Sequence, residues 1–306
     1  MKNQGFPYRA RKNFTEYKYA YFMLLPVAAY YIIFHYIPMG GIVIAFKEFR
    51  PGLGFFRSPW VGLEHFVTFF SGPYAWRVIR NTLLINLYEL VFQFPMPIVF
   101  ALLLNELRGG RYKKFIQTLS YLPHFISVVV MCGIIVSFTS RNGIVSQILS
   151  LLGQEPMNLL IKPEWFRPIF VGSTIWKTTG WASIIYIATL SRVDPALYEA
   201  AAMDGAGRFL QTVHITLPVL FPIITIQLIL RIGHIMSQGY EKVILLYNPM
   251  TYEVADIVSS YVYRAGLERA NYSFGAAVGI FNSVVNMILL VSANRISRKI
   301  NQESLW

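Results

Sequence analysis

Residues 82–104 read TLLINLYELVFQFPMPIVFALLL, a run of 23 residues in which Glu89 is the one charged side chain. A helix needs about 20 mostly apolar residues to cross ~30 Å of hydrocarbon, so the run predicts a transmembrane helix. A membrane β-barrel would show ten-residue segments of alternating polarity, and this stretch does not alternate. The stretch therefore indicates an all-α integral membrane protein.

Further stretches meet the same test and bring the predicted number of transmembrane helices to six. The other spans are Tyr19–Ile37, Thr118–Phe138, Pro168–Leu190, Leu217–Met236 and Phe274–Ala293. The first of them continues through Pro38-Met39-Gly40-Gly41 into Ile42–Phe46. Proline and glycine punctuate local structure, so the outer end of this span is a candidate for a break.

Composition supports a membrane protein and excludes other classes. Of the 306 residues, 55% are hydrophobic and 14% are charged, against roughly 25% charged in a soluble protein. Disorder is excluded, and the single cysteine, Cys132, excludes a disulfide scaffold. The net charge of +12 would suit a nucleic-acid binder, but the basic residues lie between apolar runs rather than on one soluble face. We therefore expect membrane lipid and no nucleic acid around this chain.

The distribution of charge predicts the orientation. Loops on the side of the N-terminus carry a net charge of +8, and the longer loops on the opposite side carry +3. Because cytoplasmic loops are enriched in Lys and Arg, both termini are predicted to be cytoplasmic. The predicted segments are a cytoplasmic N-terminal segment 1–18, a first helix with its outer end 19–46, an extracytoplasmic loop 47–81, a core 82–295 that contains five helices and a cytoplasmic loop 191–216, and a cytoplasmic tail 296–306.

The sequence lacks the common catalytic motifs. It has no Gly-Lys dipeptide, and therefore no P-loop for nucleotide hydrolysis. Its five histidines are scattered, without the spacing of a metal site, and no Gly-x-Ser-x-Gly nucleophile elbow is present. We expect no catalytic site and no metal site in this chain.

The cytoplasmic loop 191–216 predicts a short projecting helix. Asp194 can cap a helix that begins at Pro195, where the missing N–H costs nothing. The following residues to Asp204 are mostly good helix formers, and Gly205 supplies a left-handed end. A second helix is expected to begin near Ala206 and to enter the membrane near Pro218. On this form alone, a plain amphipathic loop helix is the favoured interpretation.

The residues of this loop carry a family resemblance. Glu199-Ala200-Ala201, Gly205 and Ile215-x-Leu217-Pro218 match the EAA motif, Glu-Ala-Ala-x3-Gly-x9-Ile-x-Leu-Pro, at every spacing. The chain resembles the permease subunits of bacterial ATP-binding-cassette importers, specifically the carbohydrate-uptake branch that includes maltose-type and alginate-type permeases. The same resemblance extends to Phe34–Met39, Ile44–Lys47, Ser58–Glu64, Asn81–Leu83, Tyr121–Ser127, Trp176-Lys177 and Tyr261–Arg264.

The resemblance implies the type I importer fold in the bacterial cytoplasmic (inner) membrane. It implies a second, related permease as partner, two ATPase subunits that bind ATP and Mg, and an extracytoplasmic solute-binding protein. No cofactor is expected in this chain. The residues that it assigns to coupling with the ATPase are Asp194, Glu199, Ala200, Ala201, Asp204, Gly205, Ile215, Leu217 and Pro218.

Polar residues within the spans are candidates for the substrate path, because ionisable groups are costly in a membrane and usually face a cavity or a partner. The candidates are Asn86, Glu89 and Gln93 in the second span, Trp176, Lys177 and Trp181 in the fourth, and Gln227, Arg231, His234 and Gln238 in and after the fifth. One interpretation is structural, with Glu89 paired to Arg231 or to Lys177. The other is a cavity wall that hydrogen-bonds sugar hydroxyls and whose surplus cation attracts an acidic, uronate-type oligosaccharide.

Other functions remain open at this point. A carrier driven by an ion gradient would usually show an inverted repeat and several membrane carboxylates. The sequence shows one intramembrane Glu and no visible repeat. A membrane-bound enzyme or sensor scaffold would need a catalytic site or a soluble output domain. Importer permeases for peptides, phosphate or amino acids share the coupling motif and are the nearest alternatives.

Overall fold

The computed structural model describes residues 17–107, 109–237 and 239–301. The predicted N-terminal segment 1–18 therefore lies outside the described residues except for its last two. The described part is helical, without a named strand, and contains one isolated antiparallel bridge between Lys47 and Trp60. The all-α fold is confirmed.

The helices follow one another with short connections. The α-helices are α2 (Lys18–Tyr31), α3 (Ile37–Met39), α4 (Gly54–Arg57), α5 (Glu64–Ser71), α6 (Ala75–Tyr88), α7 (Pro95–Glu106), α8 (Gly110–Tyr121), α9 (Val128–Thr139), α10 (Ile144–Leu151), α11 (Pro163–Leu190), α12 (Pro195–Met203), α13 (Arg208–Gln211), α14 (Leu217–Gly233), α15 (Tyr240–Leu246), α16 (Tyr252–Ala255), α17 (Val258–Val262) and α18 (Tyr272–Asn301). Wide π-helical turns are η1 (Ile32–Tyr36), η3 (Glu89–Gln93), η6 (Thr212–Thr216) and η7 (Tyr263–Glu268), and tight 3-10 turns are η2 (Gly40–Phe46), η4 (Leu122–Phe125) and η5 (Leu159–Ile161).

Five helical stretches of the described chain are long and apolar enough to cross a membrane. They are Lys18–Phe46, Ala75–Glu106, Val128–Leu151, Arg208–Gly233 and Tyr272–Lys299. The first, second, fifth and sixth predicted spans coincide with four of these. The first stretch does not break at Pro38–Gly41, because the chain there tightens into η2 and stays helical. The last helix continues to Asn301, into the segment that was predicted as a tail.

The prediction of one helix through Thr118–Phe138 is wrong. Helix α8 ends at Tyr121, and the chain passes through η4 into extended backbone at Ile126. Pro123 lies in this turn, and the side chain of Ser127 then caps a new helix, α9, by accepting a hydrogen bond of 3.2 Å from the Val130 N–H. The apolar stretch of this region is Val128–Leu151, which contains α9 and α10.

The predicted fourth span lies within α11, a helix of 28 residues. It is long enough to cross a membrane but is not one of the five apolar stretches. Lys177 and several threonines interrupt its apolar sequence. The number of six membrane spans therefore stays a prediction.

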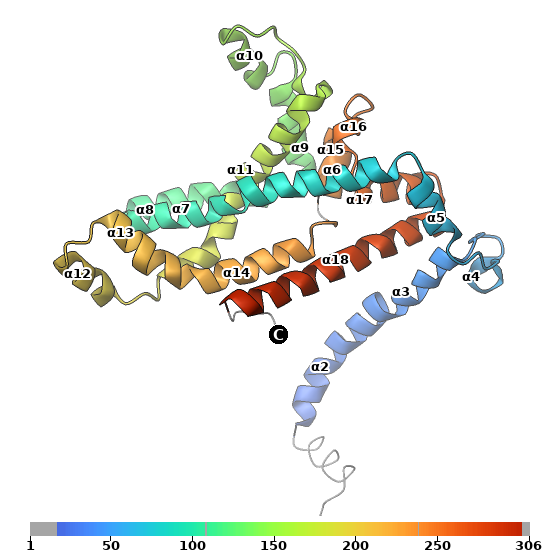
Figure 1. The fold of residues 1–306 in the computed structure, drawn as a ribbon, viewed down its shortest axis with the longest axis horizontal. Coiled ribbons are helices and arrows are strands. Elements are labelled where there is room, and N and C mark those ends of the chain that lie inside the picture. Colours follow the sequence, from blue (N-terminus) through green and yellow to red (C-terminus); the bar gives the residue numbers. More distant parts are fainter. Residues whose placement is uncertain (1–16, 108, 238, 302–306) are drawn as a thin grey trace, which may run out of the picture.

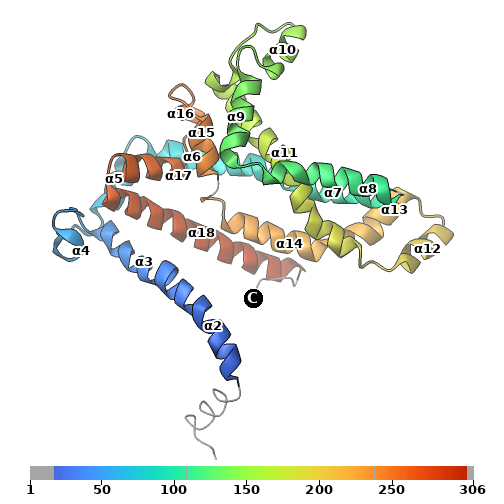
Figure 2. The same ribbon diagram turned by 180° about the vertical axis from the view of Figure 1, so that it is seen from behind.

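The helices form a bundle from which α2 projects on one side and α10 on another (Figure 1). Helix α7 packs against α11, and α14 packs against α18. Helices α8, α12 and α13 lie at one end of the bundle, and α4 and α5 lie at the other end (Figure 1, Figure 2). No residue of α2 is buried, and this helix points away from the bundle (Figure 1).

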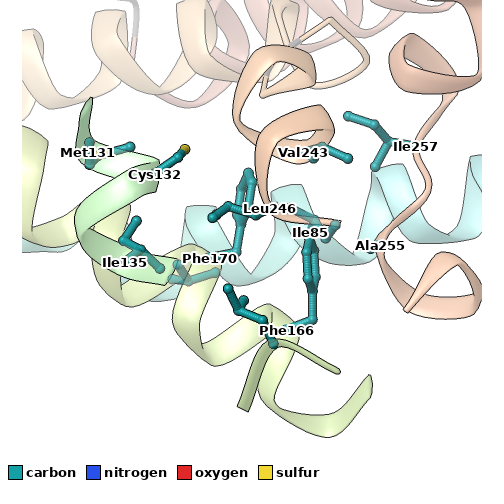
Figure 3. Close-up of a cluster of buried hydrophobic side chains, with 12 residues drawn as sticks. Ile85, Met131, Cys132, Ile135, Phe166, Phe170, Val243, Leu246, Ala255 and Ile257 are labelled. Carbon is teal, nitrogen blue, oxygen red and sulfur yellow. The ribbon is translucent and has the colours of Figure 1, made fainter. Parts of the chain in front are cut away.

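Apolar side chains fix the elements that surround the candidate site. The largest cluster joins α6, α9, α11 and α15 through Ile85, Cys132, Phe170 and Leu246, among others (Figure 3). A second cluster joins α5, α6, α17 and α18, and a third joins α7, α11 and α14. Burial of these side chains holds α15 against α11, which decides where the polar residues of both helices meet.

Candidate functional site

Helix α12 has defined caps at both ends, as the sequence predicts. The Asp194 carboxylate accepts a hydrogen bond of 2.9 Å from the Ala196 N–H, and Pro195 opens the helix. Gly205 has a φ of +80°, which only glycine adopts without strain. The Ala206 N–H then donates to the Ala201 carbonyl at 2.9 Å, which completes a Schellman ending. At 1.5 Å per residue, α12 is about 14 Å long.

Helix α12 is largely exposed in the described part of the chain. None of its residues is buried, and Met203 is 84% exposed. Glu199, Ala200 and Asp204 are exposed, whereas Ala201 is half-buried. One polar contact ties α12 to the bundle, because the Tyr198 hydroxyl lies 3.1 Å from that of Thr216.

The second half of the loop leads directly into α14. Ile215 and Leu217 are half-buried, and Pro218 lies in the first turn of α14. Proline lacks an N–H, so the regular hydrogen-bond ladder is interrupted here. The chain adopts a wide turn instead, in which the Leu217 N–H donates to the Thr212 carbonyl. The apolar stretch is nevertheless continuous from Arg208 to Gly233, so the loop and α14 form one helical rod.

Glu89 forms an ion pair with Arg231 in the middle of the bundle. The Arg231 guanidinium donates to the carboxylate of Glu89, and the Thr174 hydroxyl lies 3.2 Å from the other oxygen of that carboxylate. Glu89 is 6% exposed. In the described part of the chain, Lys177 forms no ion pair with Glu89. Of the two predicted pairings, the structure therefore contains Glu89–Arg231 and not Glu89–Lys177.

Two chambers meet at this ion pair. The chamber that we call the α15 chamber has a volume of about 450 Å³ and is lined by Glu89, Gln93, His124, Val128, Met131, Phe170, Thr174, Lys177, Thr178, Arg231, Ser237, Gly239, Tyr240, Glu241 and Lys242. The chamber that we call the α7 chamber has a volume of about 710 Å³ and is lined by Gln93, Phe94, Pro97, Trp181, Ala182, Ile184, Ile185, Tyr186, Gln227, Leu230, Arg231 and His234. Gln93 and Arg231 belong to both linings. The α7 chamber lies nearer the end of α11 that leads to α12.

Most of the predicted path residues lie in these linings. Glu89 and Lys177 line the α15 chamber, Trp181, Gln227 and His234 line the α7 chamber, and Gln93 and Arg231 line both. Gln93 also donates to the Thr178 hydroxyl at 3.1 Å. Trp181 stacks on His124 with ring centroids 4.5 Å apart and nearly parallel planes.

Two predicted path residues line neither chamber. Asn86 is buried and donates to the carbonyl of Thr82, one turn earlier in the same helix. Trp176 is 46% exposed on α11. Their assignment to the substrate path is therefore not supported by the lining of either chamber. Gln238 lies outside the described residues.

Lys242 is a chamber residue that the sequence did not reveal. It is 7% exposed, its ammonium group donates to the Phe170 carbonyl and to the Thr174 hydroxyl (2.7 Å), and it lies 4.1 Å from the centroid of the Phe170 ring. The residue belongs to the predicted outer loop, so a search restricted to the spans could not find it. The signal available was a lysine inside the short apolar helix 240–246.

A second buried network holds the connection between α16 and α17. Asp256 is fully buried and accepts hydrogen bonds from Arg264 (2.6 Å) and from the Ser260 hydroxyl (2.9 Å), while Arg77 lies 3.6 Å away. Burial acts to lower the pKa of Arg264, but the hydrogen bond and the charge of Asp256 outweigh it and raise the pKa above its usual value. This network lines neither chamber and serves the fold.

Comparisons with known proteins agree with this architecture. The chain is 45% identical over 290 residues to the polygalacturonan/rhamnogalacturonan transport system permease protein YteP of Bacillus subtilis, covering 94% of this chain and 90% of that protein. It is 46% identical to Protein LplB of the same organism over 94% of this chain and 91% of the relative. Its fold matches a crystal structure of a bacterial ABC transporter involved in the import of the acidic polysaccharide alginate, with a TM-score of 0.89, 44% identity and coverage of 96% and 99% of the two chains.

Several relatives are named as transport permeases rather than enzymes. The sequence profile described as binding-protein-dependent transport system inner membrane component matches residues 93–302, from the chamber residue Gln93 through the α12 loop to the end of α18. The chain therefore belongs to the family of inner membrane components of binding-protein-dependent transport systems.

Proposed function

We propose that this chain is a permease subunit of an ATP-driven importer of acidic oligosaccharides, and that α12 couples it to the ATPase. The observation that carries the proposal is the combination, in one permease chain, of an exposed capped helix at one end and two chambers whose linings share Gln93 and Arg231. ATP and Mg bind to the partner ATPase subunits, since this sequence has no P-loop. The nearest alternative, an importer permease for a non-sugar solute, lacks support from the relatives' names.

The chambers suit an acidic sugar. Their polar groups can hydrogen-bond hydroxyl groups, and Trp181 offers an aromatic face for a sugar ring. In the α15 chamber, three cations (Lys177, Arg231 and Lys242) outnumber two carboxylates, Glu89 and Glu241. The names of relatives point the same way, because one is a polygalacturonan/rhamnogalacturonan permease and another belongs to an importer of acidic alginate.

Transport proceeds by alternating access in this proposal. The substrate arrives from a solute-binding protein, enters the α15 chamber, passes the level of the Glu89–Arg231 pair and leaves through the α7 chamber. A related second permease closes the chambers, and a related importer has been crystallised with an alginate-loaded periplasmic protein. Both termini then lie in the cytoplasm, on the side of α12.

The helical rod from α13 to α14 offers the physical link between ATP use and the chambers. Tyr198 joins α12 to Thr216, and α14 then extends from this point to Arg231. Seventeen residues of α-helix make a rod of about 25 Å. A displacement of α12 by the ATPase is thus transmitted to Arg231, which lines both chambers.

Uptake in cells tests the proposed function. We expect deletion of the gene to abolish accumulation of radiolabelled trigalacturonate, and the plasmid-borne gene to restore it. Accumulation of maltotriose serves as the neutral control and should not depend on the gene. Uptake should stop when ATP is depleted and should survive a protonophore under conditions that preserve ATP. Unchanged trigalacturonate uptake in the deletion strain, or uptake that collapses with the ion gradient alone, would contradict the proposal.

A further inference from the structure

Some of the charged side chains that line the α15 chamber form an ion pair, and others do not. Arg231 donates to the Glu89 carboxylate, so this cation and this carboxylate compensate each other. Glu241 is exposed and its carboxylate lies 3.4 Å from the hydroxyl of the adjacent Tyr240. Within the described residues, Lys177 and Lys242 form no ion pair. Two ammonium groups of the lining therefore have no carboxylate partner of their own.

Lys242 is held in place by neutral groups. Its ammonium group has three N–H donors, and two of them bond to the Phe170 carbonyl and the Thr174 hydroxyl. The next residue, Val243, and Leu246 pack into the cluster that includes Phe170 (Figure 3). The ammonium group is thus fixed at the chamber wall.

A buried cation with neutral partners is costly, because burial removes the hydration of the charge. The nearest compensating charge is Glu89, which reaches Lys242 only through the Thr174 hydroxyl and already serves Arg231. Burial lowers the pKa of Lys242 to about 7, and the positive charge of Lys177 acts in the same direction. An anion in the chamber would offset both the burial cost and the charge of Lys177.

We propose that Lys242 and Lys177 form the subsite that binds a carboxylate group of the saccharide before it passes the Glu89–Arg231 pair. This inference rests on the proposed function and adds the residues that make the permease selective for acidic sugars. Lys242 supplies the fixed donor from α15, and Lys177 supplies a second ammonium group from α11. The α7 chamber has Arg231 as its one lysine or arginine, so the recognition of the carboxylate belongs to the α15 chamber.

Direct binding to the assembled complex tests this subsite without interference from the selectivity of the solute-binding protein. The complete permease–ATPase complex is purified in detergent, and equilibrium dialysis measures its affinity for radiolabelled trigalacturonate and for the uncharged methyl ester of the same sugar. Lys242→Gln and Lys177→Gln are compared with Lys162→Gln, which removes an exposed lysine outside both linings. Lys242→Arg keeps the charge.

We expect Lys242→Gln to weaken trigalacturonate binding at least tenfold, because it removes a charge-assisted hydrogen bond, and to leave binding of the ester unchanged. Lys177→Gln should act in the same direction, Lys162→Gln should have no effect, and Lys242→Arg should retain most of the affinity. Trigalacturonate affinity that is the same in wild type and Lys242→Gln would overturn the subsite while leaving the proposed function intact. Equal loss of acid and ester binding would show a structural role and would also overturn it. A wild-type complex that binds the ester as well as the acid would instead contradict the acidic-substrate proposal itself.

Discussion

Glu89 is the residue on which the centre of the bundle depends. It is buried, and its two carboxylate oxygens face different donors, the Arg231 guanidinium and the Thr174 hydroxyl. Removal of one member of a buried ion pair leaves the other charge buried without compensation, and this costs several kcal/mol of stability. The pair therefore links η3 to α14, and its Arg231 lines both chambers.

Replacement of Glu89 by Gln should destabilise the protein by about 3–5 kcal/mol, because it leaves the buried Arg231 without its carboxylate. The thermal unfolding midpoint of the purified protein in detergent measures the loss. Glu106→Gln is the matched control, since its pair with Arg208 has side chains that are 60% and 41% exposed and should contribute at most about 1 kcal/mol. The double variant Glu89→Gln/Arg231→Met should regain much of the stability. An unfolding midpoint of Glu89→Gln equal to that of Glu106→Gln would contradict the structural importance of the pair.

At the residue scale, sequence reasoning succeeds where periodicity applies. The spacing of Gln227, Arg231 and His234 places them on one stripe of a helix, and all three line the α7 chamber. Periodicity within spans cannot reveal Lys242, since its position depends on how α15 folds back onto α11. It also cannot tell which side of a helix faces a chamber, and Trp176 lines neither of the two.

At the scale of elements, local signals decided where helices begin and end. The caps of α12 could be predicted because Asp194, Pro195 and Gly205 each act through their own backbone chemistry. The break between α8 and α9 was missed, although Pro123 and Ser127 carry the signals of a turn and a new helix. The apolar run through this region outweighed them in the prediction. Helices α8 and α11 approach each other closely at Gly180, where a Cβ would lie 2.1 Å from the Ser120 carbonyl oxygen. The local sequence does not predict this contact either.

Gly205→Val should uncouple ATP hydrolysis from transport while the complex still assembles. A β-branched residue at a φ of +80° is strained, so the end of α12 must change its direction. Gly207→Val is the matched control, because Gly207 has a φ of −67° and open space around its Cβ position. Reconstituted vesicles would measure both ATP hydrolysis and uptake. Retention of the normal ratio of uptake to hydrolysis in Gly205→Val would refute the coupling role of α12.

At the scale of the whole molecule, one chain carries the helix that we propose docks to the ATPase and the chambers that we propose form the substrate path, at different levels of the bundle. Helix α12, the proposed coupling helix, lies at the end that carries α8 and α13 (Figure 1), and the chamber residues come from η3 through α15. The all-α class and most of the spans were predictable because a membrane imposes a length and a composition on each helix. The two chambers were not predictable from the sequence, because their shape depends on how segments distant in the sequence pack against one another.

The measurement that tests the central proposal most directly is purification of the chain from its native membranes in a mild detergent, followed by identification of the co-purifying proteins by mass spectrometry. We expect an ATP-binding-cassette ATPase and a second, related permease in stoichiometric amounts. The same purification with Gly205→Val should recover the same partners. Reproducible recovery of the chain alone, without ATPase or second permease, would contradict the assignment of α12 as a coupling helix and of the chain as one subunit of an ATP-driven importer.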